Sequence, residues 1–386
     1  MLSKRVQLLE PSATLTLDAK VKQLQADGIS VVNLTLGEPD FMTPGHIRKA
    51  AIKAIRDGFT HYTPVAGTME LRQAIAEKLL FENKVVYQPS EIVVGVGTKQ
   101  IIYLALQTLG EVGYEVVVPT PTWGTYVEQI KLAGATPVLV PLEPPFKLTA
   151  QKIAGYLSPR TRIMLLNSPA NPTGATIEPT ELRKLADLAV KRGIYVISDE
   201  IYEKILYGGR HRSIAALGEE IKRLTITVNG FSKAYAMTGW RVGYGAGPEE
   251  IIMAMAALSG QTTSGTSSVS QKAALAALQG EQQSGEKMTR EFKKRMESAY
   301  SALAKIKGIT VLKPEGAFYL FLGIERLLGE KYQTAKDWSE ALLEKARVAV
   351  VPGEAFYAPG YIRVSYTVAF GELRRGIAQI RKFIYD

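Results

Sequence analysis

The 386-residue sequence contains no cysteine and only three histidines, His46, His61 and His211. The missing thiols exclude disulfides, thiolate zinc sites and cysteine nucleophiles. The histidines lie far apart in the chain, and none pairs with another at the spacing of metal ligands. We therefore expect no metal site and no cysteine-based or histidine-metal catalysis.

Long apolar runs are also missing from the sequence. No apolar stretch reaches the roughly 20 residues that a membrane-spanning helix needs. The N-terminal run Met1-Leu-Ser-Lys-Arg5 lacks the apolar segment of a secretory signal. We expect a cytoplasmic protein with no membrane partner.

The positive charge is not concentrated in one stretch. The formal net charge is +10 and the pI is near 9.4, but the basic residues are scattered along the chain. The densest basic run, residues 287–295, is interspersed with Glu286, Glu291 and Glu297. Such alternation is typical of a solvated helix face, so we expect no nucleic-acid partner.

Short apolar segments alternate with helical patterns through most of the first 230 residues. This alternation predicts an α/β fold with a mostly parallel sheet covered by helices on both faces. Beyond about residue 285, a long charged helix and short strands predict a smaller α+β domain. We expect residues 1–40 to form an N-terminal arm and part of the small domain, residues 41–285 the large ligand-binding domain, and residues 286–386 the small C-terminal domain.

Five polar or aromatic side chains share one position relative to the predicted strands. Each lies just beyond the carboxyl end of an apolar strand, and in open α/β sheets that edge binds ligands. Taken singly, each has an ordinary explanation as a core, turn or surface residue. Together they predict one site, formed by Thr98, Trp123, Asn171, Asp199 and Lys233.

The chemistry of these residues restricts the ligand. A flat ring suits Trp123, and a phosphate suits the strand-turn-helix start at Thr98 and the guanidinium of Arg241. A lysine such as Lys233 can capture a carbonyl as an imine, and Asp199 can keep a basic ring nitrogen protonated. Pyridoxal 5'-phosphate meets all four requirements.

Three runs then establish a resemblance to a known family. They are Asn167-Ser-Pro-Ala-Asn-Pro-Thr-Gly174, Ser198-Asp-Glu-Ile-Tyr202 and Ser232-Lys-Ala-Tyr-Ala-Met-Thr-Gly-Trp-Arg241. With them the sequence resembles the class I aminotransferases of the fold type I pyridoxal-phosphate enzymes. The resemblance is closest to the prokaryotic aspartate aminotransferase subgroup, and it covers nearly the whole chain.

The resemblance implies a role for each cofactor-binding position. Lys233 would hold the cofactor as an imine and serve as the catalytic base, with Asp199 on the ring nitrogen. Asn171 and Tyr202 would bond the ring oxygen, while Trp123 would stack on the ring. The phosphate would lie among Gly97, Thr98, Lys99 and Arg241, with Tyr62 reaching the phosphate of a neighbouring subunit in a homodimer.

The resemblance also implies a substrate site and a reaction. Arg363 would clamp the substrate α-carboxylate with help from Asn171 and Gly37, and Thr14 would line the pocket. The expected reaction moves an amino group from an amino acid, L-aspartate first, to a 2-oxo acid such as 2-oxoglutarate by a ping-pong mechanism. Alternatives are an aromatic or branched-chain aminotransferase, a carbon–sulfur lyase of the same fold, or a cofactor-sensing regulator.

Two positions depart from the family pattern. Many relatives carry a phosphate-binding serine where this chain has Gly230, and Ser232 is not at the equivalent position. Enzymes of this subgroup that act on dicarboxylates often hold the distal carboxylate with a basic side chain. The segment from Gln100 to Leu109 has no such side chain, and we expect Gln107 to point inward instead.

Overall fold

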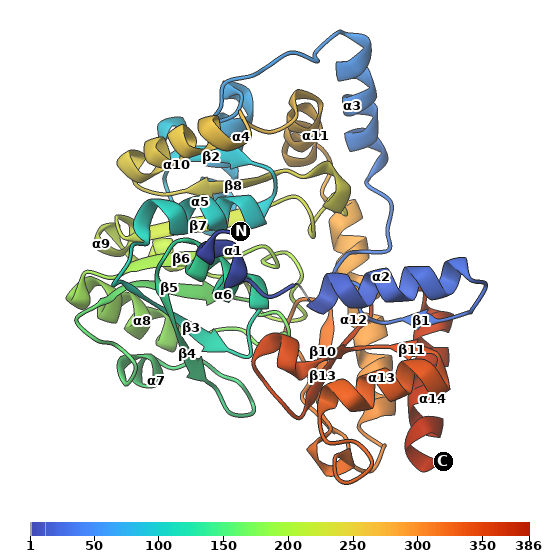
Figure 1. The fold of residues 1–386 in the computed structure, drawn as a ribbon. Helices are drawn as coiled ribbons and strands as arrows, with labels where there is room; N and C mark the ends of the chain where they lie inside the picture. The colour runs from blue at the N-terminus through green and yellow to red at the C-terminus, as the bar shows by residue number, and fades with distance from the viewer. Residues whose placement is uncertain (1, 12) are drawn as a thin grey trace.

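The computed structural model describes residues 2–11 and 13–386. A seven-stranded sheet forms the core of its larger part (Figure 1). The strand order is β2-β8-β7-β6-β5-β3-β4. The strands are β2 (Ile92–Gly95), β3 (Glu115–Thr120), β4 (Thr136–Pro141), β5 (Thr161–Asn167), β6 (Tyr195–Asp199), β7 (Thr225–Gly230) and β8 (Gly243–Ala246).

One strand of this sheet runs against the others. β8 pairs antiparallel with both β2 and β7, whereas β3 to β7 pair in parallel. β2 therefore runs in the same direction as β7, and its carboxyl end lies at the same edge of the sheet. This edge collects the turns that follow β2, β3, β5, β6 and β7.

Helices cover both faces of the sheet because successive strand residues point to opposite faces. Val116 and Val118 pack in the cluster that includes side chains of α5, α6 and α10, while Val117 packs with those of α7 and α8. A third cluster joins β2 and β8 to α3, α4 and α11. The large-domain helices are α3 (Gly45–Arg56), α4 (Met69–Lys78), α5 (Thr98–Leu109), α6 (Gly124–Leu132), α7 (Ala150–Ala154), α8 (Pro179–Arg192), α9 (Glu219–Lys222), α10 (Glu249–Thr262) and α11 (Ser268–Gln279).

The C-terminal part of the chain builds a second, smaller layer. Its antiparallel sheet has the order β12-β13-β10-β9 and packs against long helices. The elements are α12 (Gln283–Leu303), β9 (Thr310–Val311), β10 (Tyr319–Gly323), α13 (Ala335–Ala346), β11 (Val348–Ala349), β12 (Val351–Pro352), β13 (Tyr361–Ser365) and α14 (Phe370–Tyr385). Short 3-10 turns lie at Pro89–Glu91, Ile214–Leu217, Thr238–Trp240, Glu325–Leu327 and Gly353–Phe356.

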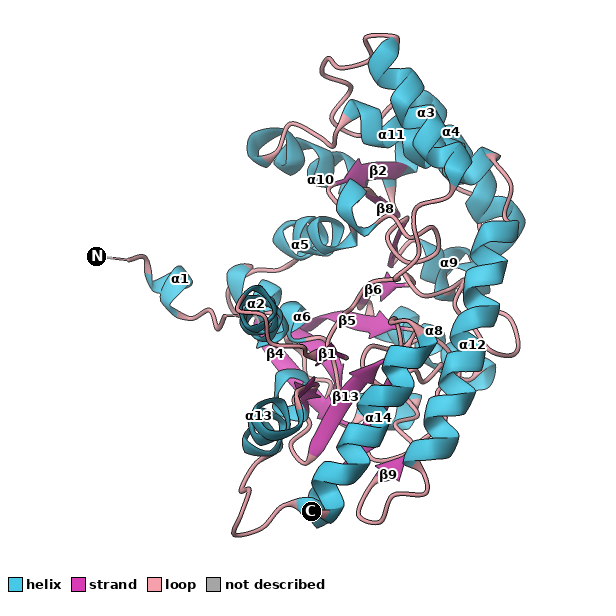
Figure 2. Ribbon diagram, turned by 90° about the vertical axis from the view of Figure 1, so that its right-hand side faces the viewer, coloured by secondary structure: helices cyan, strands magenta, loops and turns pink. Residues whose placement is uncertain are grey.

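The start of the chain joins this smaller layer. β1 (Val32–Asn33) pairs in parallel with β11, and α2 (Ala13–Ala26) shares a small core with Leu343 and Ala349. α1 (Lys4–Gln7) projects from the body of the molecule (Figure 2). The expected domain boundaries near residues 40 and 285 stay predictions.

Several elements differ from the sequence-based expectation. The apolar spacing over residues 69–83 predicts one amphipathic helix, but the segment is α-helical only to Lys78 and then forms a π-helix, Leu79–Asn83. The pair Asn229-Gly230 predicts the end of a strand, but β7 continues through both residues because β8 pairs with them. Arg295 is not on a solvated face: it is 6% exposed and donates two hydrogen bonds of 2.8 and 2.9 Å to Asp40. Within residues 2–11 and 13–386, no helix is both long and apolar enough to cross a bilayer.

Candidate active site

A cavity of about 370 Å³ lies where the carboxyl edge of the large sheet meets the smaller layer. Its volume is in the range typical of sites for small ligands. Most residues predicted from the sequence line it together. They are Thr14, Gly37, Thr98, Lys99, Trp123, Asn171, Asp199, Tyr202, Lys233, Arg241 and Arg363.

Asp199 ends β6 and is 2% exposed. Burial raises the pKa of its carboxyl to about 6, even though hydrogen bonds from Tyr126 and from the Ile201 backbone lower it. The Tyr126 hydroxyl lies 2.6 Å from Oδ2, and Ile201 N lies 3.1 Å from Oδ1. At neutral pH the carboxylate is therefore ionised in a low-dielectric site, where it favours a cationic partner.

Lys233 follows β7 and points its ammonium into the cavity, where it donates a hydrogen bond to the carbonyl of Gly37. Burial is the largest cause that lowers its pKa to about 8. Arg241 and Arg363 lower it further, while Glu38 and Asp199 oppose them. Roughly a tenth of this amine is neutral near pH 7, far more than for an ordinary lysine, which suits a nucleophile or a base.

The N-terminus of α5 and Arg241 form an anion-binding corner. Gly97 precedes the helix with φ 79°, a conformation that favours glycine. A Cβ at Gly97 would lie 2.6 Å from Arg241 Nη2, so any larger residue would displace the guanidinium. Arg241 is itself held by the carbonyls of Thr238 and Val96. Free helix N–H groups and a fixed guanidinium together suit a phosphate.

Steric crowding explains why position 230 is a glycine. A Cβ there would lie 2.9 Å from Gly243 Cα, 3.0 Å from Val242 O and 3.3 Å from Thr98 Cγ2. β7 and β8 thus pack too closely at this point for a serine hydroxyl to be added without movement. Ser232, two residues later, does line the cavity.

Trp123 and Lys99 form one wall of the cavity. Trp123 is the N-cap residue of α6, and the Lys99 ammonium lies 4.8 Å from the centre of its ring. Burial and the nearby Arg241 lower the pKa of Lys99. Gln107, which we expected to point inward, is not among the residues that line the cavity. The expected inward position of Gln107 is therefore not observed, and the basic side chain of α5 that lines the cavity is Lys99 in its first turn.

Arg363 reaches the cavity from β13 in the smaller layer and is 3% exposed. Its Nη1 donates to Asn171 Oδ1 at 2.9 Å and its Nη2 to Thr35 O at 2.7 Å. The guanidinium also stacks on the ring of Tyr319, 4.3 Å from its centre. Its buried Nε has no hydrogen-bond partner among the described residues, which leaves a donor for a ligand.

Tyr202 is buried beside this guanidinium. Its hydroxyl lies 3.0 Å from the hydroxyl of Tyr319, and burial raises the pKa of Tyr202 well above the usual value. Both phenols therefore remain protonated hydrogen-bonding groups at neutral pH. Tyr319 was not predicted, because a tyrosine in an apolar strand resembles ordinary core.

Gly97 does not line the cavity either but lies beside it in the turn before α5, whereas Tyr62 is the predicted residue that lies away from the cavity. It is 95% exposed and does not line the cavity of its own chain. Its expected role in a neighbouring subunit stays a prediction. The sequence interpretation also missed Tyr126 and Glu38, although a tyrosine three residues after Trp123 on one helix was a usable signal.

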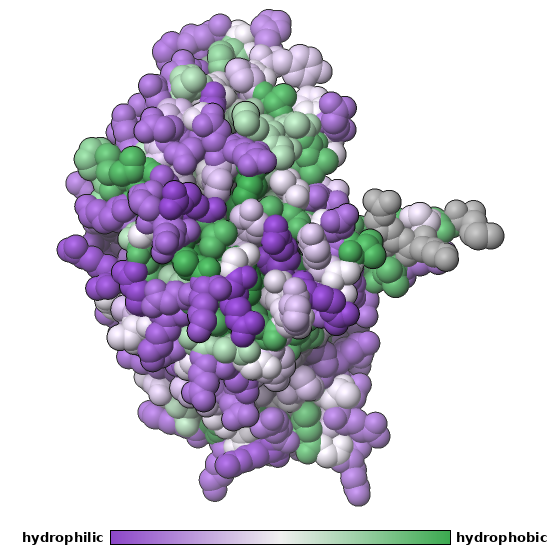
Figure 3. All heavy atoms as spheres, turned by 90° about the vertical axis from the view of Figure 1, so that its left-hand side faces the viewer, coloured by the Kyte–Doolittle hydropathy of each residue, from purple (hydrophilic) through white to green (hydrophobic). Residues whose placement is uncertain are grey.

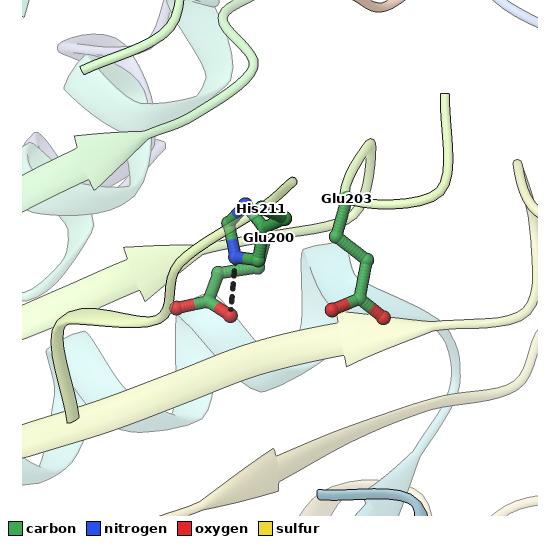
Figure 4. A group of neighbouring side chains, drawn as sticks. All are labelled: Glu200, Glu203 and His211. Atoms are coloured by element: carbon green, nitrogen blue, oxygen red, sulfur yellow. Dashed lines mark hydrogen bonds and ion pairs between the residues drawn. The ribbon is translucent and has the colours of Figure 1, made fainter. Parts of the chain in front are cut away.

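A second polar cluster follows Asp199 in the chain and consists of Glu200, Glu203 and His211 (Figure 4). Their potential ligand atoms lie within 4.8 Å of one another, which the sequence spacing did not predict. His211 Nε2 is 2.9 Å from Glu200, and Lys78 forms a buried ion pair with Glu203. The cluster therefore already contains its compensating cations and acts as an ion-pair network between β6, α4 and the loop before α9.

The cavity at the sheet edge combines an anion-binding corner, a reactive amine and a buried acid. This combination is typical of α/β enzymes that bind small anionic ligands. The model of the family "Aminotransferase class I and II" matches residues 29–380. The chain therefore belongs to this family and is an aminotransferase.

Individual relatives are similar to the chain along its whole length. A probable aspartate/prephenate aminotransferase of Aquifex aeolicus is 47% identical, over 100% of this chain and 99% of that protein. An aspartate aminotransferase of Bacillus sp. YM-2 is 43% identical over the same shares. Among solved structures, the aspartate aminotransferase of Thermus thermophilus with maleate has a TM-score of 0.95 at 39% identity, covering 99% of each chain.

Proposed function

We propose that this aminotransferase uses pyridoxal 5'-phosphate to transfer the amino group of L-aspartate to a 2-oxo acid, 2-oxoglutarate first. The observation that supports this most strongly is the meeting of Lys233, Asp199 and Arg363 in one cavity. They provide an amine for an aldehyde, an anion for a ring nitrogen and a cation for a carboxylate.

The residues present fit this cofactor. The α5 N-terminus and Arg241 would hold its phosphate, and Trp123 would face its ring. Asp199 would pair with the ring nitrogen, while Asn171 and Tyr202 would face the ring oxygen. When bound, pyridoxal phosphate supplies an aldehyde for amino groups and a protonated ring that withdraws electrons from the substrate α-carbon.

Lys233 supplies the proton transfer. Its Nζ, with a pKa lowered to about 8, takes the proton from the substrate α-carbon and later returns it. Positioned acid–base groups of this kind typically contribute about 10²–10⁴-fold to the rate. Asp199 stays anionic at neutral pH and would therefore stabilise the protonated ring nitrogen of the cofactor.

Arg363 binds and orients the substrate. Its hydrogen bonds to Asn171 and Thr35 and its stacking on Tyr319 fix the guanidinium before the substrate arrives. A fixed fork of donors suits a carboxylate, and orientation of the reacting bond lowers the entropic cost of reaction. The α-carboxylate common to all amino acids is the natural ligand.

Lys99 gives a reason to favour a dicarboxylic donor. Four cations line the described part of the cavity: Lys99, Lys233, Arg241 and Arg363. The last three have roles toward the cofactor and the α-carboxylate, which leaves the Lys99 ammonium for a second carboxylate. The Thermus thermophilus structure contains maleate, which has two carboxylates. The aromatic, branched-chain and lyase alternatives have no comparable support, and the names of the full-length relatives do not favour them.

We also propose a homodimer in the cytoplasm. Tyr62 and other large apolar side chains, including Met69 at 52% and Met253 at 58% exposure, are open to solvent in the single chain. Apolar patches interrupt the hydrophilic surface of the face seen in Figure 3. Exposed apolar surface of this kind favours a protein partner, and a second copy would bring Tyr62 near the cofactor phosphate.

The donor assignment is tested with a panel of amino acids and 2-oxoglutarate. L-Aspartate is expected to be preferred over L-phenylalanine and L-leucine. Lys99→Met should raise the KM for aspartate about tenfold and leave that for phenylalanine unchanged, since one charge-assisted hydrogen bond is lost.

Lys184→Met, at an exposed lysine on α8, is the matched control and should change neither value. If the wild type shows no preference for aspartate, the donor assignment is wrong. If no amino donor reacts at all, the cofactor assignment is wrong as well.

A further inference from the structure

Tyr126 is a buried tyrosine whose hydroxyl meets the buried acid of the active site. It is 1% exposed, lies in the first turn of α6, and donates to Asp199 Oδ2 at 2.6 Å. A buried phenol needs a hydrogen-bond partner, but any backbone carbonyl would serve. Here the partner is the one carboxylate that ends β6 at the cavity.

Both oxygens of Asp199 are held from the protein side. The Ile201 backbone N–H fixes Oδ1 at 3.1 Å, and Tyr126 fixes Oδ2. A carboxylate can accept about four hydrogen bonds, so lone pairs remain for a donor in the cavity. Burial raises the pKa of Tyr126 well above its usual range, so its hydroxyl stays a donor at all working pH values.

The same helical turn also positions the aromatic wall. Trp123 caps α6 and Tyr126 lies three residues further on, a spacing that places two side chains on one helix face. Their rings meet edge to face, with centres 5.3 Å apart and planes at 81°. A shift of α6 would therefore move Trp123 and the support of Asp199 together.

We propose that Tyr126 is a positioning residue that holds Asp199 ionised and aimed at the basic ring nitrogen of the cofactor. The proposal rests on the function proposed above. It assigns Tyr126 a role through Asp199 rather than a direct contact with substrate.

The environment of Asp199 explains why this bond matters. Burial raises the pKa of the carboxyl, and Glu200, the next residue in the chain, adds to the rise. Tyr126 from α6, the Ile201 backbone and Lys233 beyond β7 lower it, while the neutral phenol of Tyr202 lies nearby. Without the Tyr126 hydroxyl, Asp199 should take up a proton at a higher pH and lose its hold on a protonated ring.

The test compares two ligands by equilibrium dialysis with wild type and Tyr126→Phe. One is pyridoxal phosphate, and the other is its analogue in which C–H replaces the ring nitrogen. Tyr126→Phe should weaken pyridoxal phosphate binding about 10- to 100-fold, because a hydrogen bond to a charged group is lost. The loss should grow from pH 8 to pH 6, and binding of the analogue should be unchanged.

Two controls separate this role from simple packing. Tyr207→Phe removes a similar phenol, bonded to Ala317 O away from the cavity, and should leave both affinities unchanged. In an Asp199→Asn background, Tyr126→Phe should have no further effect on pyridoxal phosphate binding.

Equal weakening of both ligands, or no weakening at all, would overturn the proposal for Tyr126. Failure of the wild type to bind pyridoxal phosphate is a different result, because it refutes the proposed function itself. Circular dichroism of each variant confirms that the fold is retained.

Discussion

At the residue scale, the chemistry depends on how burial tunes two groups of opposite charge. Burial lowers the pKa of Lys233 to about 8 and raises that of Asp199 to about 6. The two shifts leave Asp199 anionic and Lys233 partly neutral at pH 7. At neutral pH the cavity therefore contains both a carboxylate that can pair with a cation and an amine that can react.

The lowered pKa of Lys233 predicts unusual reactivity in protein freed of cofactor. Near pH 7 roughly a tenth of an amine with pKa 8 is neutral, against well under a thousandth for an ordinary lysine. Trace acetylation should therefore label Lys233 faster than the exposed Lys184, with a rate that rises with pH and levels off above about 8. Equal labelling of both lysines at pH 7 would contradict the shift.

The sequence predicted most residues of the cavity because its motifs place polar groups after successive strands. Asp199, Lys233 and Asn171 could be found in this way, since a polar residue there interrupts an apolar run. Tyr126 and Tyr319 could not, because a buried tyrosine in a helix or strand is usually core. Only the hydroxyl partners, Asp199 and Tyr202, distinguish them.

At the element scale, the close pairing of β7 and β8 shapes the phosphate corner. Both strands carry a glycine where they pair, and the turn before α5 packs directly on Gly243. The sequence did not predict β8, because four residues rich in glycine give a weak strand signal. The continuation of β7 through Gly230 was not predicted either, because a glycine weakens the strand signal in the same way.

Gly230→Ser should destabilise the protein instead of improving phosphate binding. The new Cβ would meet backbone atoms of Val242 and Gly243 at 3.0 and 2.9 Å, so the strands must separate. We expect a loss of about 1–3 kcal/mol in the free energy of unfolding, measured by urea denaturation. Gly371→Ser, where a Cβ meets nothing within 4 Å, is the control. A stable Gly230→Ser variant with tighter phosphate binding would refute the steric account.

The ion-pair network of Glu200, Glu203, Lys78 and His211 links β6 to α4 and to the loop before α9. Burial disfavours the charged form of His211, but Glu200 and Glu203 outweigh it and raise its pKa above 6.5. Protonation of His211 therefore stabilises the folded state below pH 6.5. That contribution is lost as the pH rises through the raised pKa.

His211→Gln should accordingly cost about 1–3 kcal/mol of unfolding free energy at pH 6 and clearly less at pH 9. Urea denaturation at both pH values measures the difference. His61→Gln, at an exposed histidine, should cost nothing at either pH. A cost for His211→Gln that is constant with pH, or larger at pH 9, would show that the charge of His211 is not involved.

At the scale of the whole molecule, the site depends on two layers and, we propose, on two chains. Arg363 comes from the smaller layer and Asp199 from the larger, and Asn171 bonds across the boundary to Arg363. The fold class could be predicted from the alternation of strands and helices. The pairing of β1 with β11 could not, because it joins residues more than 300 positions apart in a two-residue strand.

The proposed dimer predicts a native mass of twice the 42.2 kDa of one chain. Light scattering after gel filtration measures it. Tyr62→Phe should weaken pyridoxal phosphate binding several-fold in the dimer, since one phosphate contact is lost. Tyr156→Phe, at another exposed tyrosine, should not. A monomeric mass with full activity would refute the shared site.

In the proposed site, Lys233 carries the cofactor opposite Asp199. Borohydride reduction of protein incubated with pyridoxal phosphate, followed by peptide mass spectrometry, tests it most directly. We expect one stoichiometric adduct on the peptide that contains Lys233, and none on this peptide in Lys233→Ala. An unmodified Lys233 peptide, with the adduct on another lysine, would contradict it.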